Sequence, residues 1–386
     1  MKIALVVKSL DPKRGGHEYY INRLLRGLLA KGYEIWCFAE NFSDDSTDHP
    51  KLNRITIRPC KLESSIRMLS FDRQARRLVE GHDVDFDLVF TTGNISFGDV
   101  YRAGGGVHET YMENCLSELS RWNPKHLVAR SLQRKLFKEN TPGLLITNST
   151  MVKKDLQKRY GVPEENLKVI RNGIDLERFN LAVAGETREA IREQHGFKIL
   201  DFVCLFTAGG GKRKGLAELL RALASIHSEK VKLLIVGRTD EADLNRMVKG
   251  FGLEERVVYA GFQTKIEQYY GAVDCFVFPS KYDAAANVVC EALASGIPVI
   301  TTETNGSHEL IEDGENGFVI PTADDSVGIA RGIEALAAEE NLSEIRDHAS
   351  QTGQHYSMER HIAQFEAALT EFLSRRAEGG GGKTGS

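Results

Sequence analysis

The sequence predicts an α/β protein built from two parallel sheets. Short apolar segments that suit buried strands alternate with longer amphipathic segments that suit helices, a pattern typical of parallel sheets with helices on both faces. The alternation weakens between residues 172 and 200 and then resumes. A chain of 386 residues also exceeds the roughly 150 residues of an average domain. We therefore expect two α/β domains of similar size, joined near residue 175.

Each expected element is placed by an apolar run or by apolar residues at helical spacing. The first half predicts strands at 3–7, 34–38, 88–92 and 144–147, and helices at 19–30 and 151–160. The second half predicts strands at 203–207, 232–236, 257–260, 275–278 and 298–301, and helices at 216–224, 288–294, 342–352 and 358–374. The expected domains are residues 1–172 and 173–355, with a Gly-rich tail at 376–386 that we expect to be flexible.

The composition excludes several classes of protein. The apolar runs are far shorter than the roughly 18 residues of a membrane-spanning helix, and the first expected strand leaves no room for a secretory signal. The six cysteines are scattered without a CxxC pair, which argues against a zinc site, an iron–sulfur cluster and a disulfide framework. Lys and Arg total 50 against 54 Asp and Glu, so the chain as a whole does not have the charge of a nucleic-acid binder. We expect a cytoplasmic protein.

The strongest pattern is FPSKYDAAANVVCEALASGIPVI at residues 278–300. A buried strand ends at its start, a loop carries Asp283, and small residues open a helix that contains Glu291 about two turns inside. Small residues at a helix start leave backbone N–H groups accessible to an anion, so we expect a phosphate there. The four residues expected to meet it are Ala285, Ala286, Asn287 and Val288.

Asp283 and Glu291 are candidates to hold the two ends of a nucleotide sugar. One carboxylate would accept hydrogen bonds from sugar hydroxyls and the other from ribose hydroxyls. Their spacing alone also fits a solvated loop aspartate and a glutamate on a helix surface. A second loop, TAGGGKRKG at 207–215, follows a strand and opens a helix, with Gly209 allowing close backbone approach and Arg213 and Lys214 offering charge to a diphosphate. A solvated turn is the alternative for that loop.

These two segments resemble glycosyltransferases of family 4, which retain anomeric configuration. The 278–300 block is similar to the family's E-x7-E element, with Asp283 where the family usually has its first Glu, and Arg213-Lys214-Gly215 matches its R-K-G. The resemblance covers residues 1 to about 375 and implies the GT-B fold: two Rossmann-like, doubly wound parallel-sheet domains facing across a cleft. It also implies that a C-terminal helix at about 356–375 completes the first domain. The Arg and Lys would neutralise the departing nucleoside diphosphate, so neither a metal nor another cofactor is implied.

Other segments match the family more loosely. Residues 169–179 resemble its interdomain NG-D---F signature, to which we give a positional role. Gly237, Arg238 and Phe262 follow strands where relatives line the nucleobase pocket, and Gly15 and Gly16 resemble paired glycines that lie near the donor sugar. A dinucleotide-binding GxGxxG is absent from this loop, which weakens the alternative of an NAD enzyme.

Two segments of the first domain indicate the acceptor. Residues 98–109 resemble a turn of lipopolysaccharide core glucosyltransferases, the enzymes that add the first glucose to the inner core, and make His108 a candidate for a polar catalytic group, although a lone His is as often structural. The stretch 121–138 is basic and free of acidic residues, and predicts an amphipathic helix for anionic lipid or a phosphorylated acceptor. A solvated helix face is its alternative reading. Its acceptor or membrane candidates are Arg121, Trp122, Lys125, Arg130, Arg134 and Lys135.

The sequence and the resemblance together predict transfer of a hexose, glucose being the first choice, from a UDP-sugar to a lipopolysaccharide core or another lipid-linked saccharide. Arg213 and Lys214 would stabilise the leaving group, Asp283 would hold the sugar and Glu291 the ribose. The enzyme would work in the cytoplasm, at the inner face of the membrane. The alternatives are a GT-B UDP-sugar epimerase or hydrolase, and a nucleotide-sugar-binding protein with impaired catalysis.

Overall fold

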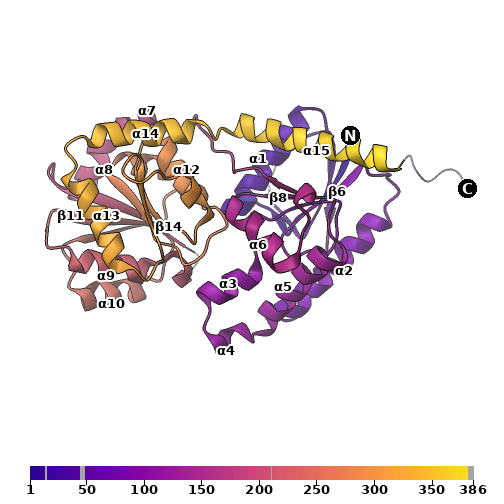
Figure 1. Cartoon of the computed structure of the whole chain (residues 1–386), viewed down its shortest axis with the longest axis horizontal. Coiled ribbons are helices and arrows are strands. Elements are labelled where there is room, and N and C mark those ends of the chain that lie inside the picture. The colour runs from indigo at the N-terminus through magenta and orange to yellow at the C-terminus, as the bar shows by residue number, and fades with distance from the viewer. Residues whose placement is uncertain (14, 44–47, 210, 381–386) are drawn as a thin grey trace, which may run out of the picture. The chain divides into compact units, whose positions relative to one another are not determined.

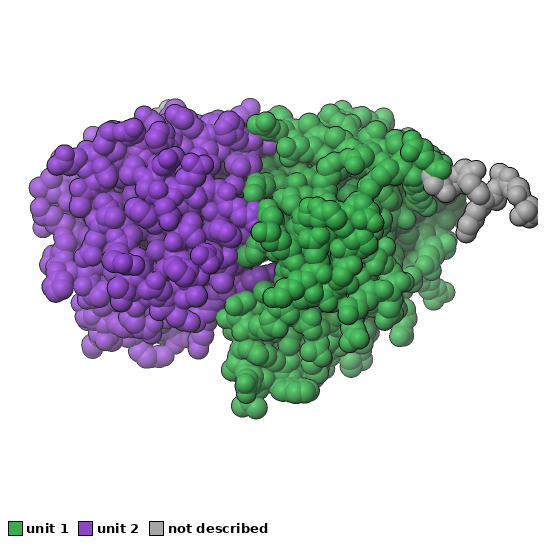
Figure 2. All heavy atoms as spheres, viewed as in Figure 1, with its two compact units in different colours: residues 1–173, 358–386 green, residues 174–357 purple. Residues whose placement is uncertain are grey.

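Figure 1 shows the computed structural model, which describes residues 1–13, 15–43, 48–209 and 211–380. The chain divides into two compact units, one of residues 1–173 with Met358–Ser386 and the other of Ile174–Ser357 (Figure 2). Each unit is an α/β layer structure around a parallel sheet, which confirms the predicted fold class. No helix in the described ranges has the length and apolar character needed to cross a membrane.

The first unit contains, in its described residues, a seven-stranded parallel sheet in the order β5-β3-β1-β6-β7-β8-β9. Its strands are β1 (Lys2–Val6), β3 (Glu34–Ala39), β5 (Leu52–Thr56), β6 (Leu88–Thr92), β7 (Val100–Arg102), β8 (Leu144–Thr147) and β9 (Leu167–Val169), with β2 (Ser9–Leu10) and β4 (Asn41–Phe42) as a separate short pair. Its helices are α1 (Gly16–Ala30), α2 (Ser64–Glu80), α3 (His108–Cys115), α4 (Glu118–Arg121), α5 (Pro124–Arg134), the π-helical turn η1 (Lys135–Glu139), α6 (Thr150–Tyr160), the 3-10 turn η2 (Glu164–Asn166) and α15 (Met358–Gly380).

The C-terminal helix α15 packs against the core of the first unit. In α15, Phe365, Leu369 and Phe372 are buried against the same side of the sheet as the leucines of α1. The two helices approach closely at Gly27, where an added Cβ would lie 2.2 Å from Cδ1 of Ile362. The helix continues to Gly380, beyond Leu373, the last side chain that packs on this core, so residues 376–380 of the expected tail are helical. Residues 381–386 lie outside the described part of the chain.

The second unit contains a six-stranded parallel sheet, among its described residues, in the order β12-β11-β10-β13-β14-β15. Its strands are β10 (Phe202–Ala208), β11 (Val231–Gly237), β12 (Val257–Gly261), β13 (Cys275–Phe278), β14 (Val299–Thr302) and β15 (Gly317–Ile320). Its helices are α7 (Leu181–Glu186), α8 (Arg188–Gln194), η3 (Gly211–Lys214), α9 (Leu216–Ser225), α10 (Glu241–Phe251), α11 (Ile266–Gly271), α12 (Asn287–Ala294), η4 (Gly306–Leu310), α13 (Ser326–Ala338) and α14 (Leu342–Gln354).

The order of strands indicates where a ligand would bind in the second unit. β10 lies between β11 and β13, so the direction of winding reverses at the β10–β13 pair, where Cys204 is opposite Cys275. In open parallel sheets, ligands bind beyond the carboxyl ends of the strands at such a reversal. The loops that leave these two strands are 209–215 and 279–286, the two segments that the sequence singled out. The first unit has the equivalent reversal between β1 and β6.

Candidate functional site

The two loops of the second unit meet through Arg213 and Asp283. Nη1 of Arg213 lies 2.6 Å from Oδ2 of Asp283 and donates to the backbone carbonyl of Tyr282 at 2.9 Å. In return, the backbone N–H of Lys281 donates to the carbonyl of Arg213 at 2.8 Å. The structure therefore joins a cation predicted for the diphosphate to the carboxylate predicted for the sugar.

Lys214 lies on the inner side of this contact. Its Nζ is 3.4 Å from the carbonyl oxygen of Thr207 and 5.1 Å from the centre of the Phe278 ring. Burial lowers the pKa of Lys214 to about 8, with Arg213 acting in the same direction and the carboxylates of Asp283 and Glu291 opposing it. A buried ammonium with few polar partners is well suited to a ligand that brings negative charge.

Gly215 allows the two loops to approach each other. Its φ is +80°, and an added Cβ would lie 1.9 Å from the carbonyl oxygen of Pro279. Only glycine accepts both the left-handed conformation and this contact without displacement. The R-K-G pattern therefore has a geometric basis in its third residue.

Asn305 positions the loop that carries Asp283, and sequence reasoning missed it. The Asn305 side chain is fully buried; its Oδ1 accepts from the backbone N–H groups of Ala286 (3.2 Å) and Ser307 (3.1 Å), and its Nδ2 donates to Thr301 Oγ1 (3.0 Å). The backbone of Asp283 completes the link, because its N–H donates to the Thr304 carbonyl and its carbonyl accepts from Gly306. A buried Asn gives no pattern in the sequence that would reveal this role.

The start of α12 has the properties expected of an anion site. Its N-cap residue, Ala286, supplies no side-chain hydrogen bond to the first turn, and the positive end of the helix dipole lies there. Ala285, Ala286, Asn287 and Val288 all lie in this turn, between Asp283 and Glu291. The structure therefore places these predicted residues together.

Glu291 lies further along α12 and is held by Tyr270. The hydroxyl of Tyr270 lies 3.1 Å from Oε2 of Glu291 and 3.2 Å from the carbonyl oxygen of Val288. Burial raises the pKa of Glu291, and the hydrogen bond from Tyr270 and the charges of Arg178 and Lys214 oppose that rise. Tyr270 is a second residue that the sequence did not reveal.

The remaining predicted donor residues of the second unit follow two neighbouring strands. Gly237 ends β11 with a φ of +121°, and the guanidinium of Arg238 lies 4.3 Å from the ring centre of Phe262, which follows β12. Phe262 is 55% exposed, so one side of its ring is available to stack with a planar ligand. Gly209, at the end of β10, has a φ of +126°.

In the first unit, Gly15 and Gly16 form the start of α1 at the strand reversal. Gly15 is the N-cap and Gly16 the first helical residue. The imidazole Nε2 of the next residue, His17, lies 3.1 Å from Oγ1 of Thr92 at the carboxyl end of β6. This contact fixes the glycine turn to the edge of the sheet where ligands bind.

His108 is the first residue of α3 and pairs with another histidine. Its backbone N–H donates to Gln133 Oε1 at 2.8 Å, and its Nε2 lies 3.1 Å from Nδ1 of His126, with the rings stacked 5.2 Å apart. Burial, followed by the charges of His126 and Lys125, lowers the pKa of His108 to about 4. The imidazole is therefore neutral at physiological pH, which limits it to donating or accepting a hydrogen bond.

The predicted continuous helix over 121–138 is wrong. The chain breaks between α4 and α5, because Asn123 caps the new helix by accepting from the N–H of Lys125 at 3.0 Å and Pro124 begins it. Arg121, predicted as an acceptor or membrane contact, has contacts within its own unit. Its guanidinium donates to the carbonyls of Met112, Glu113 and Leu116 and so closes the end of α3. The other candidates are exposed: Trp122, Lys125, Arg130, Arg134 and Lys135.

The interdomain signature is part of a buried network in the first unit. Oδ1 of Asn172 accepts from Nη2 of Arg102 at 2.5 Å, and the Arg102 guanidinium lies 3.7 Å from the ring centre of Tyr20. The Tyr20 hydroxyl lies 2.6 Å from Nε2 of His361, whose Nδ1 is 2.6 Å from the carbonyl oxygen of Arg171. These contacts join α1, β7 and α15 to the segment that leaves the unit.

Two family models match the chain, one after the other. "Glycosyltransferase Family 4" matches residues 14–178 and "Glycosyl transferases group 1" matches residues 201–339. Among curated relatives, an uncharacterized glycosyltransferase of Methanocaldococcus jannaschii is 25% identical over 358 residues, covering 88% of this chain and 90% of the relative. The lipopolysaccharide glucosyltransferase WaaG of Escherichia coli is 22% identical over 312 residues, covering 79% of this chain and 82% of WaaG.

Solved structures show the same fold. A crystal structure of WaaG, described as a glycosyltransferase involved in lipopolysaccharide biosynthesis, has a TM-score of 0.81 at 19% identity and covers 95% of this chain and 98% of its own. Anabaena Alr3699/HepE, crystallised with UDP and glucose, has a TM-score of 0.69 at 21% identity, covering 96% and 99%. The two models and the shared GT-B fold show that this chain consists of a Glycosyltransferase Family 4 domain followed by a Glycosyl transferases group 1 domain.

Proposed function

We propose that this chain transfers a hexosyl group from a UDP-sugar, with UDP-glucose the first choice, to the lipopolysaccharide core or another lipid-linked saccharide, and retains the anomeric configuration. WaaG, which it resembles over most of its length, is named a lipopolysaccharide glucosyltransferase, and the similar HepE was crystallised with UDP and glucose. We assign donor binding to the second unit, predicted as residues 173–355, and acceptor binding to the first.

The observation that carries the proposal is the cluster at the β10–β13 reversal. Arg213 and Lys214 place two cations beside the start of α12, where a diphosphate would meet their charge and the positive end of the helix dipole. Glu291 is half-buried on the same helix and suits the ribose hydroxyls. These residues supply the charge stabilisation that a departing UDP requires, without a metal ion.

The reaction follows from this assignment. The bond between the anomeric carbon and the diphosphate oxygen breaks, and the leaving UDP keeps the electron pair. The acceptor hydroxyl attacks from the same face and gives its proton to the departing diphosphate oxygen. Asp283 is the carboxylate assigned to the sugar, and its ion pair with Arg213 makes it a weak nucleophile. We therefore favour front-face substitution over a covalent glycosyl-enzyme. His108, neutral in its pair with His126, would contact an acceptor hydroxyl.

The turn between α4 and α5 supports a membrane-associated acceptor. Leu119 is 88% exposed and Trp122 is 74% exposed, and Lys125 lies beside them at the start of α5. Exposed apolar rings next to lysines are typical of segments that lie at the surface of anionic membranes. We infer peripheral binding at the inner face of the cytoplasmic membrane through this turn.

The donor assignment is tested with UDP-, ADP- and GDP-sugars, using isothermal titration for binding and release of nucleoside diphosphate for turnover. A UDP-sugar should bind, and Lys214→Ala should remove turnover. If no nucleotide sugar binds, the assignment fails. Turnover of the donor alone would favour a hydrolase or epimerase, and tight binding without turnover on any acceptor would favour a nucleotide-sugar-binding protein.

The membrane assignment is tested by co-sedimentation with phosphatidylglycerol vesicles. Leu119→Ser with Trp122→Ser should reduce binding at least tenfold, and raising the salt concentration should weaken what remains. Ile199→Ser with Leu200→Ser removes two similarly exposed apolar side chains from the second unit and serves as the matched control. Equal loss in both variants would contradict the assignment.

A further inference from the structure

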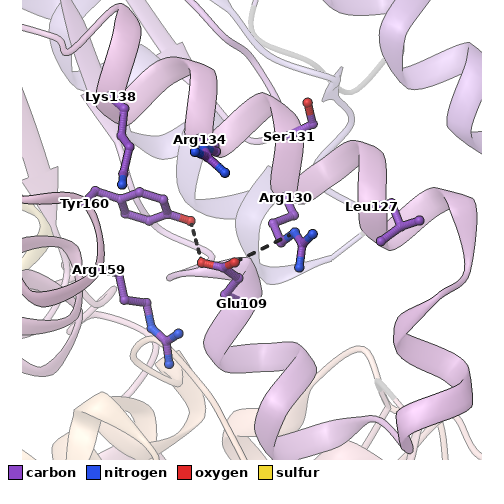
Figure 3. A pocket seen from close by; sticks show the side chains of 8 residues that line it. All are labelled: Glu109, Leu127, Arg130, Ser131, Arg134, Lys138, Arg159 and Tyr160. Carbon is purple, nitrogen blue, oxygen red and sulfur yellow. Dashed lines mark hydrogen bonds and ion pairs between the residues drawn. The ribbon is translucent and has the colours of Figure 1, made fainter.

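A pocket of about 430 Å³ lies within the first unit, between α3, the α5–η1 helix and α6 (Figure 3). It is part of a single compact unit, so its shape depends on contacts inside that unit alone. None of its side chains takes part in the donor cluster described above. Its lining residues are Glu109, Leu127, Arg130, Ser131, Arg134, Lys138, Arg159 and Tyr160.

Three of the pocket's cations come from one side of the α5–η1 helix. Arg130, Arg134 and Lys138 are four residues apart, and side chains at that spacing share a helix face. In a regular α-helix each such step drifts by about 40° around the axis. The wider π-helical turn η1, at Lys135–Glu139, opposes this drift and keeps Lys138 over the pocket, as Figure 3 shows.

The cations of the pocket differ in how far they are already neutralised. Arg159 forms ion pairs with Glu113 and, at 2.7 Å, with Asp155. Arg130 reaches only Glu109, at 3.8 Å. Within the described ranges, Arg134 and Lys138 have no carboxylate within ion-pair distance. The pocket therefore has positive charge left over for an anion.

The same pocket contains groups that suit hydroxyls. Glu109 lies between Arg130 and Tyr160, with the Tyr160 hydroxyl 3.5 Å from its Oε2, a distance too long for a strong hydrogen bond. Burial raises the pKa of Tyr160, so its hydroxyl stays a proton donor at physiological pH. Ser131 adds a third hydroxyl-binding group on the rim. A carboxylate and hydroxyls are of little use to bare phosphate but match a sugar.

We propose that this pocket binds a phosphorylated saccharide of the acceptor, with the phosphoryl group held by Arg134 and Lys138 and a neighbouring sugar ring by Glu109 and Tyr160. The inference rests on the proposed function, since it names the class of acceptor. A lipid headgroup also carries phosphate, but the Glu109 carboxylate and the Tyr160 hydroxyl beside the cations favour a sugar. The exposed Trp122 lies before α5, and the 11 residues from Pro124 to Arg134 span about 15 Å of helix, so a membrane contact at Trp122 is separate from the pocket.

The test titrates glucose 6-phosphate and inorganic phosphate into the whole chain with the donor site filled by UDP. Arg134→Gln with Lys138→Gln should weaken glucose 6-phosphate binding at least tenfold. The matched control is Arg73→Gln with Arg77→Gln, which removes two exposed cations at the same spacing from α2 and should change the affinity less than twofold. All of these side chains are exposed, and thermal unfolding of each variant checks the fold.

Glu109→Gln separates a sugar site from a simple anion site. Loss of the carboxylate should strengthen inorganic phosphate binding several-fold, because a repulsive charge is removed, and should abolish the preference for glucose 6-phosphate. Unchanged affinity in the Arg134–Lys138 variant, or absence of saturable phosphate binding by the wild type, would overturn the proposal. So would loss of phosphatidylglycerol vesicle binding by that variant with glucose 6-phosphate binding intact, since the ligand would then be a lipid headgroup.

The two proposals fail in different ways. If the second unit is not a donor site, UDP does not bind to any variant, and the phosphate titrations still report on the pocket. If only the pocket proposal is wrong, UDP binds with the same affinity to wild type and to both double variants, and glucose 6-phosphate affinity does not follow Arg134 and Lys138.

Discussion

The guanidinium of Arg213 lies 2.6 Å from the carboxylate of Asp283, and this ion pair links the loops that follow β10 and β13. Both side chains are more than two thirds buried, so solvent screens the pair only in part. The E-x7-E element that this block resembles has a Glu at this position, whose chain is longer by one methylene. Here the shorter carboxylate reaches Arg213 directly, so the two groups hold each other in place beside the start of α12.

Asp283→Asn should lower kcat/KM for the UDP-sugar at least 100-fold, or roughly 2.7 kcal/mol. The amide neither balances the charge of Arg213 nor accepts sugar hydroxyls as strongly as a carboxylate. Steady-state kinetics on the donor measures the change. Asp324→Asn is the control. The Asp324 side chain is 79% exposed, and its carboxylate lies 3.5 Å from Nζ of Lys281 in the same loop as Asp283. Equal kinetics for wild type and Asp283→Asn would remove Asp283 from the site.

The pKa of Lys214 predicts how UDP affinity depends on pH. Burial lowers this pKa from 10.5 to about 8, so the free protein loses the ammonium charge as the pH rises through 8. A bound diphosphate favours the charged form and raises the pKa again, so binding takes up a proton in this range. Titration of UDP between pH 6.5 and 9.5 should show affinity falling above about pH 8.

The control for this dependence is Lys214→Arg, which stays charged across the range and should give a flat profile above pH 8. The lowered pKa of Lys214 also makes the stability of the fold depend on pH. Between pH 8 and 10.5 the unfolded chain holds the proton more tightly than the folded one, so Lys214 should make the protein more stable as the pH rises in that window. A wild-type UDP affinity that is constant up to pH 9.5 would argue against a role for the Lys214 charge.

Gly215→Ala should destabilise the fold and misplace the Arg213–Lys214 turn. The new Cβ meets the Pro279 carbonyl at 1.9 Å and also forces an alanine to a φ of +80°. Gly252→Ala has a similar φ of +67° but open space around its Cβ, so it isolates the cost of the conformation, about 1 kcal/mol. Urea unfolding should show a loss at Gly215 that exceeds the loss at Gly252 by 1 kcal/mol or more. Equal losses would mean that the loop contact with Pro279 is not important.

The arrangement of the proposed donor site could be predicted from the sequence because its residues lie in short continuous segments. Arg213 and Lys214 share one loop, and Asp283 and Glu291 share one strand–loop–helix block, so spacing alone approximates their arrangement. Asn305 and Tyr270 could not be predicted in this way. Each side chain comes from a segment distant in the sequence. It contacts the site residues only because the folded sheet places that segment next to α12.

In the first unit, the pattern of basic residues led to a wrong helix prediction, although a helix-start signal lies within it. The basic residues from 121 to 138 predicted one helix, yet Asn123-Pro124 is itself a helix-start signal and divides the stretch. The role of Arg121 depends on where α3 ends, which the sequence did not define. The phosphate pocket is likewise absent from the sequence pattern, because Arg159 and Tyr160 come from α6.

Asn305→Ala should weaken both stability and UDP binding. It leaves the buried N–H groups of Ala286 and Ser307 without their acceptor, at a cost of about 2–4 kcal/mol. Asn316→Ala is a matched control, because Asn316 is equally buried and bonds Glu312, Leu310 and Thr352 away from the site. Both variants should lower the unfolding free energy, but only Asn305→Ala should raise the Kd for UDP more than tenfold. A similar Kd in the two variants would show that Asn305 supports the fold alone.

Tyr270→Phe should shift the acid side of the UDP-affinity profile to higher pH. Burial raises the pKa of Glu291, and the hydrogen bond from the Tyr270 hydroxyl lowers it, so removing that hydroxyl raises the pKa further. In its proposed role Glu291 accepts hydrogen bonds from ribose hydroxyls as a carboxylate, so UDP affinity should be lost as the pH falls through its pKa. The variant should therefore bind UDP nearly as well as wild type at pH 8 and several-fold more weakly at pH 5.5, as measured by isothermal titration.

The control is Tyr269→Phe, which removes the neighbouring hydroxyl. That hydroxyl has no bond to Glu291, so this variant should keep the wild-type pH profile. Parallel profiles for wild type and Tyr270→Phe would mean that the ionisation of Glu291 does not control UDP binding, and the ribose assignment would then have to be given up.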